Sequence, residues 1–89
     1  MATLRTSTIT DEVLDFLATN PTPQQIIEFR ASDILQERLR YLLEQNREGV
    51  LTPQESSELD EMQHMNHFMA MLKARVRIKM MEEQNELHS

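Results

Sequence analysis

The sequence GVLTPQE, residues 49–55, contains the signals for the end of one helix and the start of the next. Gly49 is the one glycine of the chain, and glycine most readily adopts the positive φ found just after a helix C-terminus. Thr52, Pro53 and Glu55 follow as an N-cap, a first helical residue and the second half of a Thr-x-x-Glu capping box. Two helices joined by so short a link form an αα-hairpin.

Apolar residues repeat at helical spacing on both sides of this turn. Upstream, a leucine every three or four residues predicts a helix over about 33–48, with Ser32 as its N-cap. Downstream, the same spacing predicts a helix over about 53–83, which would be about 45 Å long. The first helix is about half that length, so part of the second needs cover from the N-terminal segment or from another chain. The leucines of the first helix are Leu35, Leu39, Leu42 and Leu43.

The segment before the hairpin predicts one or two short helices. Thr10 is the expected N-cap of a helix over about 11–18, whose acidic first residues favour the positive end of the helix dipole. Thr22 followed by Pro23 predicts a second helix start, because proline is tolerated at the first helical position. The apolar residues of this second segment are Ile26, Ile27 and Phe29.

These patterns predict a single all-α domain. A chain of 89 residues supports one small core. Residues 1–9 and 84–89 carry little apolar pattern, so we expect a disordered tail at each end. The domain itself is expected to cover residues 10–83, with the long αα-hairpin at 33–83, and to be completed by oligomerisation.

The composition argues against several classes of function. The formal net charge of −6 opposes general nucleic-acid binding, because phosphates repel a negative surface. One glycine and no cysteine leave no glycine-rich phosphate loop and no thiolate metal site. Ser56 and Ser57 lack the strained turn that activates a serine nucleophile. We therefore expect a non-enzymatic protein without a cofactor. No leader or membrane-length apolar run is found, so we expect it in the cytoplasm.

Methionine is concentrated in one part of the chain, since six of the seven lie between residues 62 and 81. Flexible methionine side chains suit adaptable interfaces as well as cores. One row of apolar residues there advances by three or four, as in a heptad a/d seam. The row is either the core of the chain or a protein interface, and we predict that it is buried in a homo-oligomer, most simply a dimer. Its members are Leu59, Met62, Met65, Met69, Leu72, Val76 and Met80.

The stretch KARVRIK, residues 73–79, places four positive charges near the end of the long predicted helix. Lys73 is four residues from Arg77, and Arg75 is four from Lys79, so the two pairs point in different directions. The simplest interpretation is the basic end of a packed helix, where the dipole favours cations. The alternatives are contact with an acidic partner and contact with nucleic acid, which the net charge disfavours.

Glu61, His64 and His67 follow one another at intervals of three residues. Glu-x-x-His is a ligand spacing of helical di-metal sites, but these sites need two such motifs and further carboxylates. This chain has one such motif, and its third histidine, His88, lies in the predicted tail. We therefore interpret the histidines as solvent-facing and predict no metal site.

Three segments of the chain resemble a family of small helical bacterial proteins that is frequent in cyanobacteria and has no established activity. They are TPQQIIEFRAS (22–32), GVLTPQESSELDE (49–61) and LKARVR (72–77), and the resemblance spans about residues 11–78. It implies an antitoxin-like role as a partner protein, because related genes tend to lie beside nuclease-like genes.

Residues and resemblance together favour a protein-interaction module, in its antitoxin-like form a regulator that binds and restrains a partner enzyme. A dimeric nucleic-acid-associated regulator using residues 73–79 is the alternative, and a purely structural oligomer is the third. Steep salt dependence would distinguish nucleic-acid binding from the other two.

Overall fold

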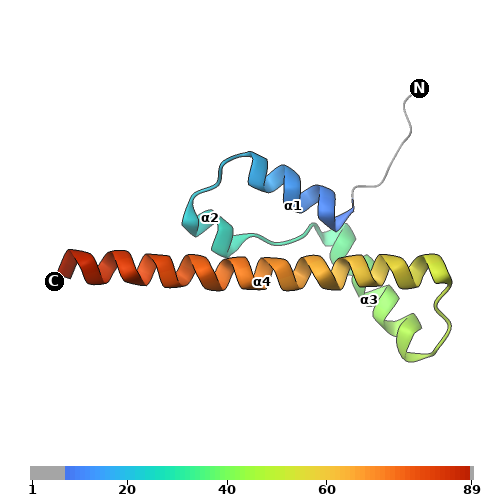
Figure 1. The fold of residues 1–89 in the computed structure, drawn as a ribbon. Helices are drawn as coiled ribbons and strands as arrows, with labels where there is room; N and C mark the ends of the chain where they lie inside the picture. Colours follow the sequence, from blue (N-terminus) through green and yellow to red (C-terminus); the bar gives the residue numbers. More distant parts are fainter. Residues whose placement is uncertain (1–7, 89) are drawn as a thin grey trace, which may run out of the picture.

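The computed structural model describes residues 8–88, with side chains placed up to residue 85. Within this range the chain forms four α-helices and no strand, which confirms the all-α prediction (Figure 1). The helices are α1 (Ile9–Ala18), α2 (Pro23–Glu28), α3 (Asp33–Arg47) and α4 (Pro53–His88).

Helix α4 is the axis of the molecule, and the other three helices pack against it (Figure 1). Its 36 residues correspond to about 54 Å, close to the longest dimension of the molecule, which measures 56 × 37 × 18 Å. The radius of gyration is 16.7 Å, whereas a compact chain of this length would have about 12 Å. The protein is therefore an elongated assembly of short helices along one long helix.

The predicted hairpin turn is confirmed in detail. Gly49 adopts a φ of +74°, and its N–H and that of Val50 donate to carbonyls of the last turn of α3 at 3.1 and 3.0 Å. This pair of hydrogen bonds is a Schellman motif, which satisfies carbonyls that the helix itself leaves unpaired. After the turn, Thr52 and Glu55 form the reciprocal capping box, with both bonds at 3.1 Å.

The N-caps of α2 and α3 also follow the prediction. The hydroxyl oxygen of Thr22 accepts a hydrogen bond from the Gln25 N–H, with Pro23 at the first helical position. Ser32 caps α3 in the same way. Because these caps satisfy backbone donors through side chains close in sequence, they form wherever the local pattern occurs.

Helix α1 begins earlier than predicted. Its N-cap is Thr8 instead of Thr10, because Thr8 and Asp11 exchange two hydrogen bonds of 3.1 Å as a capping box. Thr10 lies inside the helix and donates a 2.6 Å hydrogen bond to Glu61 of α4. The predicted tail over 1–9 is wrong for its last two residues, since Ile9 is buried in the core. Residues 1–7 lie outside the described residues.

The C-terminal ends of α3 and α4 also differ from the prediction. Helix α4 continues to His88, beyond the predicted end near Glu83, so residues 84–88 are helical instead of a disordered tail. No proline or glycine occurs there to stop the helix. Helix α3 ends at Arg47, with Glu48 as its C-cap.

The core lies where α1 and α3 meet the N-terminal half of α4. Val13 of α1 and Leu42 of α3 are its fully buried side chains. Phe16 and Phe29 stack with ring centroids 4.6 Å apart, which joins α1 to the end of α2. The buried residues are Ile9, Val13, Leu35, Leu42, Leu59, Met62 and Met69. None of the helices described is both long and apolar enough to span a membrane.

An ion pair joins α3 to α4 and should make the stability depend on pH. Arg38 donates two hydrogen bonds, of 2.8 and 2.9 Å, to the carboxylate of Glu58. This bonding lowers the pKa of Glu58 below its ordinary value of 4.5. A carboxyl with a lowered pKa stabilises the folded chain above pH 4.5, and this contribution is lost as the pH falls through the folded-state value.

We therefore expect Glu58→Gln to lower the free energy of unfolding at pH 7 by at most about 1 kcal/mol, because both side chains are more than a third exposed. The difference from wild type should shrink at pH 3. Urea unfolding at both pH values measures it, with Glu83→Gln at an exposed position of α4 as the control. A difference that stays constant between the two pH values would contradict this assignment.

Candidate protein-interaction surface

The apolar row that was predicted as an interface contains three buried residues and four half-buried ones. Leu59, Met62 and Met69 are 4–6% exposed, because α1, α2 and α3 already cover them. The oligomer interface predicted for these three residues is thus corrected: they form the core of the single chain. Met65 and Leu72 are half-buried beside this core. The two remaining members, Val76 and Met80, are also half-buried.

A second apolar row runs along the opposite side of α4. Phe68, Met71 and Ile78 are 42, 52 and 54% exposed, and with Arg75 they advance by three, four and three residues. Residues two positions apart on a helix point about 160° away from each other, so Met71 faces away from the buried Met69. Together with neighbouring side chains these four residues line a shallow depression. We call Phe68, Met71, Arg75 and Ile78 the outer strip.

Sequence reasoning missed the outer strip, although its signal is present. The prediction placed Met71 off the apolar row and did not connect it with Phe68 or Ile78. A long helix can carry two rows with the same 3–4 spacing on different faces. Which row becomes the core depends on where the other helices pack. The residue spacing within α4 does not predict that packing.

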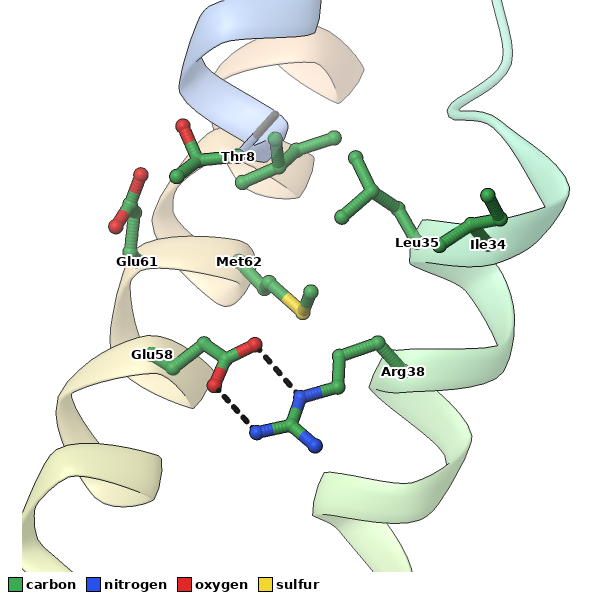
Figure 2. Close-up of a pocket in the computed structure, with 8 residues that line it drawn as sticks. Thr8, Ile34, Leu35, Arg38, Glu58, Glu61 and Met62 are labelled. Atoms are coloured by element: carbon green, nitrogen blue, oxygen red, sulfur yellow. Dashed lines mark hydrogen bonds and ion pairs between the residues drawn. The ribbon is translucent and has the colours of Figure 1, made fainter. Parts of the chain in front are cut away.

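A separate groove lies between the start of α1, α3 and α4 (Figure 2). It has a volume of about 380 Å³, with Ile9, Leu35 and Met62 among its apolar lining and the Arg38–Glu58 pair at one side. Ile34 lines it while remaining 71% exposed. The groove therefore combines apolar and charged surface, but Arg38 and Glu58 already pair with each other, and Glu61 accepts a hydrogen bond from Thr10.

The basic stretch does not form one face. Lys73 is half-buried, and its ammonium donates a 2.7 Å hydrogen bond to the carbonyl of Phe29, the C-cap residue of α2. This contact fixes α2 against α4 in the manner expected of a cation at a helix C-terminus. Arg75 belongs to the outer strip, whereas Arg77 points to the other side of the helix. The fourth cation, Lys79, is exposed.

The histidines and the neighbouring carboxylate of the Glu-x-x-His motif lie on α4. His64 and His67 are exposed, and Nδ1 of His64 contacts the carbonyl oxygen of Asp60 at 2.9 Å. Glu61 accepts the hydrogen bond from Thr10. Among the residues that the structure describes, no group of three or more histidine, aspartate or glutamate side chains could hold a metal ion.

Charge is distributed unevenly along α4. All charged side chains in its first turns are acidic. The four cations of 73–79 follow in the third quarter of the helix, and Glu82 and Glu83 come after them. The N–H of Thr52 donates a hydrogen bond to Glu55, and this bond lowers the pKa of that carboxyl. Ion pairs within the described residues involve α3 alone or α3 with α4: Arg38–Glu58, Arg40–Glu37 and Arg47–Glu44. The outer side of the basic stretch thus has no ionic partner in this part of the chain.

The chain was compared with protein-family models, curated proteins and solved structures, and no match was found.

Proposed function

We propose that this chain is a non-enzymatic protein-interaction module whose binding surface is the outer strip of α4. The observation that carries the proposal is the exposure of Phe68, Met71 and Ile78 in one row on a helix face that no other described helix covers. Scattered exposed apolar residues are normal in proteins, whereas a contiguous row suggests an interaction site.

The chemistry of the strip supports recognition of another protein. An apolar row with 3–4 spacing is what a helix presents to a partner helix or to an apolar groove. Phenylalanine adds a large apolar contact area, and methionine adapts to the shape of the partner. Arg75 within the row adds a charge that a partner carboxylate could bind.

The antitoxin-like role is a narrower form of this proposal. In it the module binds and restrains a partner enzyme, as the resemblance noted above implies. The outer strip would then provide the contact surface that was predicted on the Leu59–Met80 row.

The nucleic-acid alternative has less support from the geometry. Lys73 is engaged by the carbonyl of Phe29, and Arg75 and Arg77 point away from each other. A phosphate backbone is best bound by cations that share one face. The formal net charge of −6 also opposes binding to phosphates.

Met71→Glu is expected to abolish partner binding without unfolding the chain. A carboxylate in the strip must be desolvated on binding, while in the free chain it stays in water because Met71 is exposed. Affinity purification of tagged wild type and variant from the native host, each with and without nuclease treatment, measures the loss by quantitative mass spectrometry.

The matched control is Gln84→Glu, which adds the same charge to an exposed position of α4 that points about 140° from Met71. Circular dichroism confirms that both variants keep their helices. A partner captured equally by Met71→Glu would contradict the proposed surface, and a partner lost on nuclease treatment would favour the nucleic-acid alternative.

A further inference from the structure

We infer that the outer strip binds a second copy of this chain, with the two α4 helices antiparallel. This inference rests on the proposed function, since it names the partner of the same surface. Two properties of α4 support it: the spacing of the strip and the order of charges along the helix.

The spacing of the outer strip is that of a coiled-coil seam. Phe68, Met71, Arg75 and Ile78 advance by three, four and three residues, which gives alternating a and d positions. The same register continues to Glu61 and His64 on one side and to Glu82 on the other. A seam over residues 61–82 would extend for about 33 Å, a length that two helices of this chain can share because α4 spans residues 53–88.

The charge order of α4 favours the antiparallel arrangement. Residues 55–61 carry four acidic and no basic side chains, and residues 73–79 carry four basic and no acidic ones. A parallel pair would place each block beside the same block of its partner, where like charges repel. An antiparallel pair in the register of the outer strip brings the end of each acidic block, Asp60 and Glu61, beside the partner's basic block. The arrangement closes on itself with two-fold symmetry, so this contact forms twice.

The position of Arg75 also favours the antiparallel arrangement of the two α4 helices. In an antiparallel seam, a positions of one helix pack opposite d positions of the other. If Phe68 of each copy packs opposite Met71 of the other, Arg75 lies opposite His64 of the second copy. It is then one layer from Glu61 of that copy. In a parallel seam the two Arg75 side chains would face each other between apolar layers, which costs desolvation and repulsion. Arg75 has no ionic partner within the described residues, and the second copy supplies one.

Sedimentation equilibrium of the purified full chain tests the inference. Wild type is expected to be a dimer. Arg75→Glu is expected to raise the dimer Kd by about tenfold or more, because the new carboxylate then lies near Glu61 of the second copy. Arg77→Glu makes the same change of charge on the other side of α4 and should leave the Kd within about threefold. Combining Arg75→Glu with His64→Arg, at the exposed position opposite it, should restore much of the affinity, because a carboxylate and a guanidinium then face each other.

Cross-linking tests the direction independently, because the chain has no cysteine of its own. Ser57 and Glu82 are exposed and continue the register at opposite ends of the seam. A mixture of Ser57→Cys and Glu82→Cys chains should form a cross-linked heterodimer with a short bis-maleimide. Either variant alone should stay uncross-linked, since like residues would be about 37 Å apart along the antiparallel pair.

The outcomes separate this inference from the proposed function. A monomeric wild type overturns the inference, whereas the proposed function stands if another protein is still captured through Met71. If neither Arg75→Glu nor Met71→Glu changes the dimer Kd, the inference is also overturned, because the contact between the two copies then lies elsewhere. Efficient cross-linking of one cysteine variant alone shows a parallel pair and contradicts the inferred direction.

Discussion

Leu42→Ala is expected to lower the free energy of unfolding by about 2–5 kcal/mol, a large part of the stability of a chain this small. Leu42 is fully buried between α3 and α4. Removing most of its side chain costs the transfer free energy of the lost carbons and leaves a cavity. The core of this elongated protein has seven buried residues within the described part of the chain, so few neighbours can move in to fill the cavity.

Urea unfolding followed by circular dichroism measures this change, at one fixed protein concentration because self-association would add to the apparent stability. Leu43→Ala is the matched control, since Leu43 is the next residue of α3 and remains 42% exposed. It should cost less than about 1 kcal/mol. Equal losses for the two variants would show that α3 does not pack through the Leu42 side.

Val13→Asp is expected to detach α1 from α4. Val13 is fully buried, and a carboxylate placed there would have no partner among the apolar side chains around it. The cost of an unpaired buried charge is about 3 kcal/mol or more, which exceeds what a helix of 10 residues can recover by itself. Hydrogen exchange should show the amides of α1 exchanging at least about 100-fold faster.

Leu14→Asp tests the same helix from its outer side. Leu14 is 58% exposed, so the new carboxylate stays in water and the exchange of α1 amides should change little. If Leu14→Asp released α1 as strongly as Val13→Asp, the orientation of the helix would be the reverse of the one described. Intact protection of α3 in Val13→Asp would further show that the hairpin folds without α1.

Local signals in the sequence were sufficient for most of the helix boundaries. The caps at Thr22, Ser32 and Thr52 and the turn at Gly49 depend on side chains within a few residues, so the pattern alone identifies them. The start of α1 was missed because Thr8 and Thr10 are both acceptable caps by local criteria. The hydrogen bond from Thr10 to Glu61 and the burial of Ile9 show that long-range contacts accompany the earlier start.

The candidate site could be predicted only in part. The sequence showed that α4 carries more apolar surface than its hairpin partner can cover, and that the methionines are central to it. It assigned that surface to the row containing Met62 and Met69, which the chain buries by itself. The groups actually left exposed, such as Phe68 and Met71, lie on the other side of the helix.

The helical class, the hairpin, the cap residues and the uneven charge of α4 could be read from the sequence alone, because each of these depends on neighbours within one or two turns. The choice of the face of α4 that became the core and the face that stayed open depended on tertiary packing. Two rows with the same spacing are equivalent in an isolated helix, and the packing of α1, α2 and α3 on one side removes that equivalence. The same packing ties Lys73 to the end of α2 while Arg75 stays on the outer strip.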